Sequence, residues 1–276
     1  MKALKKVFNF YINSSIHVAL AIAALIKLTF LKFDILEDST YLHFSFTGSI
    51  VAYNFIKYAS VKELYHRQLA RFMYQIKIVT AISGLFCVYF GTQLPKEVLI
   101  YGLPFAILTV LYGTPILPNK KNLRNVAGVK IFIIGLVWTG VTAIIPLVYI
   151  EKGGFSFDMF IEVIQRFIFI IVLMLPFEIR DMQYDAPDLE TIPQKIGVTR
   201  TKVFGGVLLV VFLLLTAFKD ELSSIEILST IAVTIMSLIF LWGTEKKQST
   251  YFSSFWVESV PIIWLFSFLF LEKLFS

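Results

Sequence analysis

The sequence has little of what soluble enzymes and secreted proteins rely on. Only 16% of its 276 residues are charged, and it has a single cysteine, Cys87, whereas soluble domains carry roughly 25% charged residues. One cysteine excludes a disulfide framework and a cysteine-based zinc site. Three histidines without an H-E-x-x-H pattern leave a zinc hydrolase unsupported.

Hydrophobic residues, by contrast, make up 57% of the chain, and its mean hydropathy is +0.77. This composition excludes a disordered chain, a small secreted scaffold and a soluble nucleic-acid-binding protein. Apolar runs of the roughly 17–25 residues that a helix needs to cross a bilayer recur along the chain. We predict an all-α integral membrane protein with one domain over residues 1–276, surrounded by membrane lipids. Nine transmembrane helices are expected, at 15–32, 41–58, 75–92, 97–114, 127–149, 158–177, 203–219, 225–242 and 256–273.

The basic residues predict an orientation for these helices. With the N-terminus in the cytoplasm, most of the 25 Lys and Arg residues fall in or beside the inner loops, as the positive-inside rule requires. The net charge of +6 then needs no nucleic acid as a partner. The longer loops, at 59–74, 115–126 and 178–202, lie on the same face. We therefore expect an active site on the cytoplasmic side of a bacterial-type inner (plasma) membrane.

The segment Pro176–Asp188 carries three carboxylates, Glu178, Asp181 and Asp185, spaced i, i+3, i+7. On a helix they share one face, where they repel one another unless a cation lies among them. Oxygen ligands of this kind suit magnesium, which bridges to substrate phosphates, and Arg180 on the same stretch can pair with a phosphate. The alternative is a solvated acidic loop.

This segment and the residues after it resemble the UbiA superfamily of intramembrane prenyltransferases. The second aspartate-rich motif of that family, D-x-x-D-x-x-x-D followed by T-[LI]-P-x-x-[LI]-G, is similar to residues 178–197, with glutamate at the first acidic position. Leu111–Pro115, followed by Lys120 and Lys121, looks like the Y-x-x-P segment and basic pair of the family. The nine expected helices and the cytoplasmic loops agree with the family architecture.

The resemblance implies a UbiA-type bundle and a prenyltransferase, an enzyme that transfers alkyl or aryl groups other than methyl. Magnesium would assist the departure of diphosphate from a polyprenyl diphosphate, and the prenyl cation would alkylate a lipid-soluble acceptor. Asp181 and Asp185 would be catalytic magnesium ligands, with Glu178 in support. Four basic residues are candidates to bind the diphosphate oxygens: Lys120, Lys121, Arg180 and Lys195.

The first motif of the family, N-D-x-x-D-x-x-x-D, is incomplete in this chain. Asn54 matches, but Phe55, Tyr58 and Lys62 stand at the aspartate positions. Asn54 is a candidate catalytic residue that orients the metal cluster, or else it makes an interhelical hydrogen bond. Lys57 and Lys62 are candidates to supply positive charge in place of a metal, or else they are ordinary basic residues at the membrane edge.

Three other functions stay open at the level of sequence. An internal double bond as acceptor would make the protein a terpene cyclase, and a non-catalytic relative would only bind a prenyl lipid. A small transporter needs a polar path through both leaflets, and the outer half offers little beyond Arg166.

Several other intramembrane residues are candidates for a role. Glu258 is expected within reach of the site, where it orients the basic pair or a substrate hydroxyl, or pairs with another helix. Arg166 is expected to have a buried partner or to extend its charge to the membrane surface, and His17 is expected to be a hydrogen-bonded packing residue. Five aromatic residues are candidates to line an isoprenoid tunnel, where ring faces stabilise a carbocation: Phe44, Phe46, Phe55, Phe132 and Trp138.

Overall fold

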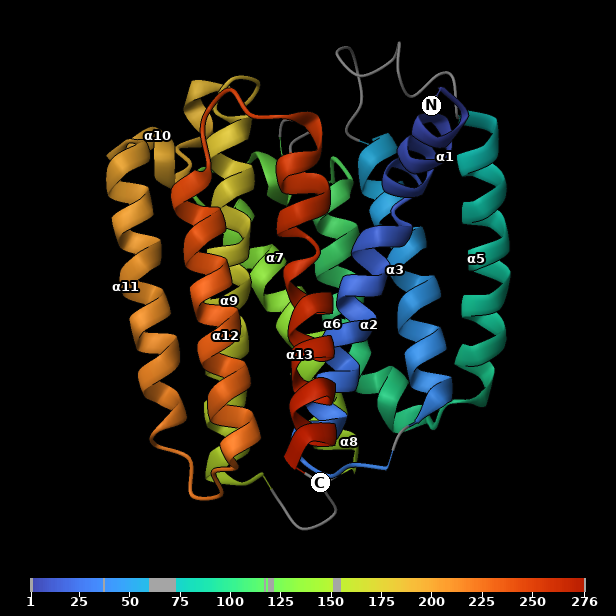
Figure 1. Cartoon of the computed structure of the whole chain (residues 1–276). Coiled ribbons are helices and arrows are strands. Elements are labelled where there is room, and N and C mark those ends of the chain that lie inside the picture. The colour runs from blue at the N-terminus through green and yellow to red at the C-terminus, as the bar shows by residue number, and fades with distance from the viewer. Residues whose placement is uncertain are drawn as a thin grey trace.

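The computed structural model describes residues 2–36, 38–59, 73–116, 118, 122–150 and 155–275. These residues form helices joined by loops, without β-strands. Figure 1 shows the helices side by side in one bundle, with the N- and C-termini at opposite ends. The all-α prediction is therefore confirmed for the described part of the chain.

The longer elements follow the apolar runs of the sequence, because each run is long enough for several helical turns. Each of the nine expected segments is helical. The elements are α1 (Lys2–Asn13), α2 (Ile16–Lys32), α3 (Ser39–Ala59), α5 (Met73–Gln93), α6 (Lys96–Gly113), α7 (Lys130–Thr139), η3 (Gly140–Ile144), α8 (Ile145–Ile150), α9 (Phe157–Asp181), α11 (Val198–Thr216), α12 (Ser224–Gly243), η5 (Phe252–Val257) and α13 (Val260–Phe275), with the short helices η2 (Leu123–Asn125), η4 (Pro187–Leu189) and α10 (Ile192–Ile196) between them.

Among the described residues, seven helices are long and apolar enough to cross a membrane, or up to eight if the bent pair α1–α2 counts as one crossing. Helix α3 is not one of the seven, because polar residues such as His43, Asn54 and Lys57 lower its hydropathy. The chain thus has the helices of a membrane protein. Nine crossings and a cytoplasmic N-terminus stay predictions.

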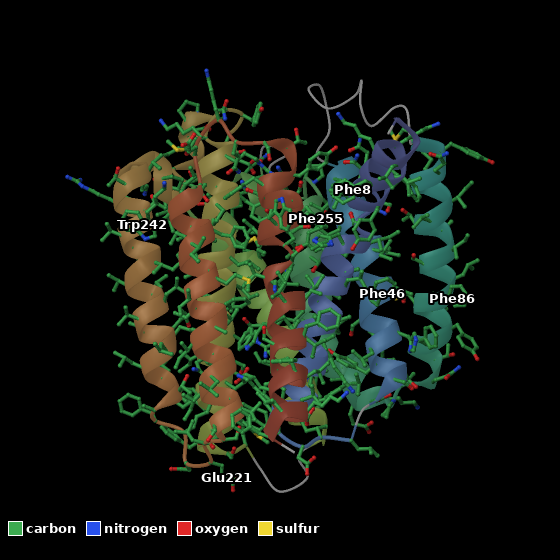
Figure 2. The ribbon with its side chains drawn as sticks, viewed as in Figure 1. Phe8, Phe46, Phe86, Glu221, Trp242 and Phe255 are labelled. Carbon is green, nitrogen blue, oxygen red and sulfur yellow. The ribbon has the colours of Figure 1, made fainter. Side chains whose placement is uncertain are left out.

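The exterior of the bundle is apolar. Large hydrophobic side chains such as Leu85, Phe86 and Ile239 are half or more exposed, and Figure 2 shows apolar side chains projecting outward, Phe86 on α5 among them. An apolar surface of this extent is stable when lipid rather than water covers it.

The bundle has two halves that meet at α9. Helix α9 packs against α7 on one side and against α11 and α12 on the other, while α13 packs against α12 and α2. Helix α3 packs against α2, α5 and α6. In the tightly packed half, a Cβ at Gly205 would come within 2.6 Å of the Leu175 and Leu241 side chains. Helices α9, α11 and α12 therefore pack closely at this glycine.

The π-helical segment η3 interrupts the run from α7 to α8. A π-helical turn breaks the regular backbone hydrogen bonding of an α-helix, and side chains from other helices donate to carbonyl groups here. The Tyr41 hydroxyl donates to the Val141 carbonyl at 2.7 Å, and the Thr29 hydroxyl donates to the Thr142 carbonyl at 2.7 Å. These hydrogen bonds attach α2 and α3 to η3.

Candidate binding cavity and its charged end

A cavity of about 1890 Å³ lies inside the bundle. It is larger than the roughly 300–1,000 Å³ that suits a drug-sized ligand. Residues of both α1 and α8 line it, and these two helices lie at opposite ends of the bundle in Figure 1. The cavity therefore runs along most of the bundle and has room for a long chain molecule.

The greater part of the wall is apolar. Lining side chains come from α2, α3, α6, η3 and α8, among them Ile22, Phe44, Val98, Phe105 and Ile145. Nothing charged lines the wall around these residues in the described part of the chain. This section suits the hydrocarbon part of a ligand.

Charged side chains gather at the other end of the cavity, where α3 and α9 end and α7 begins. Among the described residues, six basic and three acidic side chains line the cavity there: Lys5, Lys6, Lys57, Arg124, Lys130, Arg180, Asp181, Asp185 and Glu258. The cations exceed the carboxylates, so this end attracts an anionic group. We refer to it below as the charged end.

Lys130 lies between the two aspartates of the predicted metal site. Its Nζ is 2.8 Å from Asp185 Oδ2 and 3.7 Å from Asp181 Oδ2. Arg180 Nε donates to the other oxygen, Asp181 Oδ1, at 2.8 Å. The side chains of Lys130, Asp181 and Asp185 are 11%, 19% and 12% exposed, so these pairs are largely shielded from water.

The three carboxylates of the acidic segment do not share one helical face. Helix α9 ends at Asp181, and Asp185 follows in a turn in which its amide donates to the Asp181 carbonyl at 2.8 Å. Glu178 is 3% exposed, does not line the cavity, and its Oε2 has no hydrogen-bond partner among the described residues. The expectation of a shared face over all three is therefore wrong, because the helix stops before Asp185.

These residues as arranged do not fit a magnesium ion. Magnesium requires free carboxylate oxygens in near-octahedral geometry, and both oxygens of Asp181 already pair with Lys130 or Arg180. In the described part of the chain, no three or more His, Cys, Asp and Glu side chains form a group that could hold a metal ion. Magnesium stays a prediction of the sequence.

The segment that follows Asp185 forms a compact cap beside the charged end. At the start of α10, the Thr191 amide donates a hydrogen bond to Gln194 Oε1 at 2.9 Å. Gln194 Nε2 also donates to the Ala186 carbonyl at 3.1 Å. Lys195 on α10 pairs with Glu190 at 2.6 Å, is 56% exposed and does not line the cavity. The segment that resembles the second aspartate-rich motif thus holds the two aspartates in position, whereas the Lys195 side chain lies apart from them.

Asn54 is fully buried and does not line the cavity. Its Oδ1 accepts from Ser15 Oγ at 2.8 Å, and its Nδ2 donates to the Ser14 carbonyl at 3.1 Å and to Thr80 Oγ1 at 2.8 Å. Ser15 has a positive φ of 63° at the break where α1 and α2 meet at 59°. The hydrogen bonds of Asn54 therefore fix this break. They agree with the alternative in which Asn54 makes an interhelical hydrogen bond.

Lys57 reaches the cavity from the last turn of α3. Its Nζ donates to Ser15 Oγ at 2.8 Å and to the Asn13 carbonyl at 3.4 Å. Glu258 lines the same end and interacts electrostatically with both Lys57 and Arg180. Glu258 directly follows the π-helical segment η5, a kind of irregularity that is frequent at functional sites. The predicted proximity of Glu258 to the site is confirmed.

Three of the predicted basic residues, Lys62, Lys120 and Lys121, lie outside the described residues. The structure brings two others to the charged end instead. Arg124 and Lys130 line the cavity, although the sequence pattern marks them only as basic loop residues. A signal was present, because Lys130 falls within an expected membrane span, where a charged residue needs a partner.

Aromatic residues also line the cavity. Of the five predicted tunnel residues, Phe44, Phe55 and Trp138 line the cavity, whereas Phe46 and Phe132 do not. Sequence reasoning missed Tyr53, whose hydroxyl accepts a hydrogen bond from Trp138 Nε1 at 2.6 Å. That hydrogen bond joins two aromatic side chains that both line the cavity.

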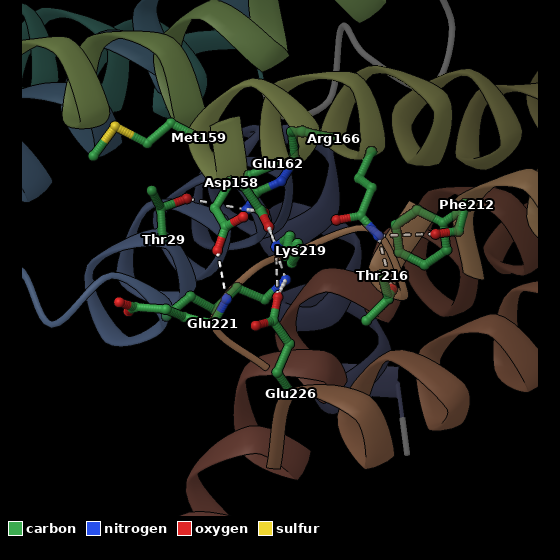
Figure 3. A network of polar contacts seen from close by, with 12 residues as sticks. Thr29, Asp158, Met159, Glu162, Arg166, Phe212, Thr216, Lys219, Glu221 and Glu226 are labelled. Atoms are coloured by element: carbon green, nitrogen blue, oxygen red, sulfur yellow. Dashed lines mark hydrogen bonds and ion pairs between the residues drawn. The ribbon is translucent and has the colours of Figure 1, made fainter. Parts of the chain in front are cut away.

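A second group of charges is buried near the opposite end of the bundle (Figure 3). Glu162 pairs with Arg166 Nη2 at 2.8 Å and with Lys219 Nζ at 2.8 Å. Lys32 pairs with Glu162 and Glu226 at 3.0 and 3.1 Å. The expected buried partner of Arg166 is thus Glu162. Four charged residues of the described chain lie in this cluster besides Arg166: Lys32, Glu162, Lys219 and Glu226. None of the five lines the cavity.

His17 has the polar partners expected of a packing residue. One ring nitrogen lies 2.7 Å from the Tyr11 hydroxyl, and the other lies 3.0 Å from the Phe255 carbonyl. The ring is 2% exposed and is not among the residues that line the cavity. It therefore links the start of α2 to η5.

Comparisons with models of known protein families, with curated proteins and with solved structures found no match. The fold and the cavity define an all-helical membrane protein with a deep apolar cavity that ends in a cluster of charges. The resemblance to the UbiA superfamily stays a prediction.

Proposed function

We propose that this chain is a membrane-embedded prenyltransferase that transfers the prenyl group of a polyprenyl diphosphate to a lipid-soluble acceptor. The observation that carries the proposal is the union of two environments in one cavity. Its long apolar section suits an isoprenoid chain, and its charged end has more cations than carboxylates. A ligand that fills both has an apolar tail and a multiply negative head group.

The reaction follows from this placement. The bond between C1 of the prenyl chain and the diphosphate oxygen breaks, and its electron pair leaves with the diphosphate. Lys57, Lys130 and Arg180 stabilise the charge that develops on the leaving group. The allylic cation remains beside the rings of Tyr53 and Trp138, whose faces attract positive charge without adding to it.

The acceptor completes the transfer. An electron pair of the acceptor forms the new bond to C1, and the acceptor then loses one proton. Glu258 lines the charged end and is the carboxylate that takes this proton. The proposal includes a UbiA-type bundle in a bacterial-type inner membrane, with the charged end on the cytoplasmic side.

A transfer assay tests the proposal. The purified chain is supplied with radiolabelled geranylgeranyl diphosphate, with and without a lipid extract of the source cells, and the lipid products are separated. We expect a labelled lipid that forms only with the extract, together with release of diphosphate.

The matched controls are Asp181→Asn/Asp185→Asn, at the charged end, and Lys195→Gln, outside the cavity. Loss of product in the first variant only supports the proposal. Diphosphate release without any extract would instead indicate a terpene cyclase or a diphosphate lyase. Binding without release in any condition would indicate a prenyl-lipid-binding protein and would overturn the enzyme assignment.

A further inference from the structure

The aspartates at the charged end already have a cation between them. Lys130 is the first residue of α7, and its Nζ lies within 4 Å of both Asp181 and Asp185. Arg180 holds the second oxygen of Asp181. A divalent ion at this position would have to displace both basic side chains from largely buried pairs.

The charges that line the cavity suffice for an anionic head group without a metal. In the described part of the chain, six basic and three acidic side chains line it, so an excess of positive charge remains after each carboxylate is paired. Phosphate oxygens accept hydrogen bonds from lysine and arginine directly. The head group therefore finds its counter-charges in the protein.

We propose that Lys130 takes the place of a divalent cation in this site, so that the cavity binds the phosphate or diphosphate head group of a lipid without a metal ion. The inference rests on the proposed function for the identity of the ligand. Lys130 has three N–H donors. One donates to Asp185 Oδ2 at 2.8 Å, and the ammonium group lies 3.7 Å from Asp181 Oδ2, which leaves N–H donors for a phosphate oxygen. The two aspartates act as positioning residues that hold the lysine in place.

The experiment compares binding with and without magnesium. The purified full chain in detergent is freed of metal with EDTA, and the binding of radiolabelled farnesyl diphosphate is measured with EDTA or with excess magnesium. We expect the two dissociation constants to agree within about threefold, because removal of magnesium leaves the protein's own counter-charges in place. Inorganic diphosphate is tested in parallel and is expected to bind more weakly, because it has no apolar tail.

Substitution of Lys130 gives a sharper test. Lys130→Gln is expected to weaken binding in EDTA by about ten- to a hundredfold, which is the range for the loss of a hydrogen bond to a charged group. Lys130→Arg keeps the charge and should bind within about threefold of the native chain. Lys195→Gln removes an exposed lysine outside the cavity and should have no effect.

Magnesium should rescue the Lys130→Gln variant in part. That substitution frees Asp181 Oδ2 and Asp185 Oδ2, which become available to a divalent ion. We expect binding by Lys130→Gln to depend on magnesium, although binding by the native chain does not. A lysine with a merely structural role would not produce this change in metal dependence.

Several outcomes overturn the inference. Native binding that requires magnesium, or no binding by a folded chain in either condition, would contradict it, as would Lys130→Gln binding in EDTA like the native chain. Equal affinities for inorganic diphosphate and farnesyl diphosphate would contradict the inference that the ligand is a lipid. Binding and transfer that both occur only with magnesium would leave the proposed function intact and overturn the inference. Metal-free binding without transfer would support the inference and overturn the function.

Discussion

At the scale of single residues, the charged end depends on side chains that hold each other in place. Asp181 fixes two cations at once, since Lys130 and Arg180 approach its two oxygens. A lysine or arginine that is held in one position needs no reorganisation when charge develops on a leaving group. We therefore expect Asp181 to act by holding Lys130 and Arg180 in position.

Replacing Asp181 should separate turnover from binding. Asp181→Asn leaves the cations in the cavity but removes the charge that aligns them. We expect the KM for the prenyl diphosphate to change less than threefold and kcat to fall by about a hundredfold, the scale for a small misplacement of reacting groups. Steady-state kinetics measures both parameters, with Glu190→Gln, which breaks an exposed ion pair, as the control. A large rise in KM with an unchanged kcat would contradict the positional role.

Two adjacent glycines offer a matched test of packing. A Cβ at Gly205 would lie 2.6 Å from buried Leu175 and Leu241 side chains, whereas one at Gly206 would lie 3.9 Å from Leu238. Gly205→Val should lower the free energy of unfolding by about 1–3 kcal/mol through overpacking. Gly206→Val should change it by about 0.5 kcal/mol or less. Thermal unfolding in detergent measures both, and equal effects would show that α11 does not pack on α9 and α12 through Gly205.

At the scale of elements, the buried ion cluster joins helices that would otherwise meet only through apolar contacts. Glu162 of α9, Lys32 of α2, Glu226 of α12 and Lys219 of the loop after α11 are all within 3.1 Å of a partner. Burial by itself would lower the pKa of Lys219, but Glu162 and Glu226 outweigh it and raise that pKa. Lys219 therefore stays charged, and its contribution to stability is present below the usual lysine pKa and is lost only as the pH rises through the raised value.

Removing one carboxylate from the cluster should destabilise the fold strongly. Among the described ion pairs, Glu162→Gln leaves Lys32 and Lys219 with Glu226 as their remaining carboxylate partner, and it removes the carboxylate partner of Arg166. We expect the free energy of unfolding to fall by about 3–5 kcal/mol, the range for breaking a buried ion pair. Denaturant unfolding in detergent tests this. A change no larger than that of an exposed pair, about 1 kcal/mol, would show that water enters the cluster.

The sequence predicts the elements better than it predicts how they meet. Each expected apolar run is helical, because the length and hydropathy of a run determine whether it forms a helix in lipid. The end of α9 at Asp181 depends on the turn that follows, which hydropathy does not report. The pair of Lys130 with Asp185 joins residues 55 positions apart, so no local pattern predicts it. The sequence therefore finds the aspartates of the site, but it does not find their partner.

At the scale of the whole molecule, the two halves of the bundle have different tasks. The cavity lies on the α2, α3, α6 and α7 side of α9, and no described residue of α11 or α12 lines it. The α11 and α12 side is packed closely around α9 and contributes to the buried ion cluster. One half thus contains the cavity, and the other packs against α9, which ends at Asp181.

The length of the cavity should set the preferred length of the ligand. Gly102 of α6 lines the cavity, and a Cβ at this glycine would meet only Ile145 Cδ1, at 3.8 Å. Gly102→Phe should fill the apolar section far from the charged end. We expect the affinity for geranylgeranyl diphosphate to fall at least about tenfold more than that for geranyl diphosphate, because the longer chain loses several buried CH₂ groups at about 0.8 kcal/mol each. Competition binding with both donors measures the ratio of the two affinities. An equal loss of affinity for the two donors would contradict a prenyl tail that points toward α6 and α8.

We propose that one cavity holds the head group at Lys57, Lys130 and Arg180 and the tail toward α6 and α8. The most direct test is photo-crosslinking with a prenyl diphosphate that carries a diazirine at the tail end, followed by peptide mapping. We predict labelled peptides from α6 and from η3–α8, with labelling that unlabelled geranylgeranyl diphosphate prevents and that Lys195→Gln does not alter. Labelling confined to the outward faces of α11 and α12, without protection by the competitor, would contradict it.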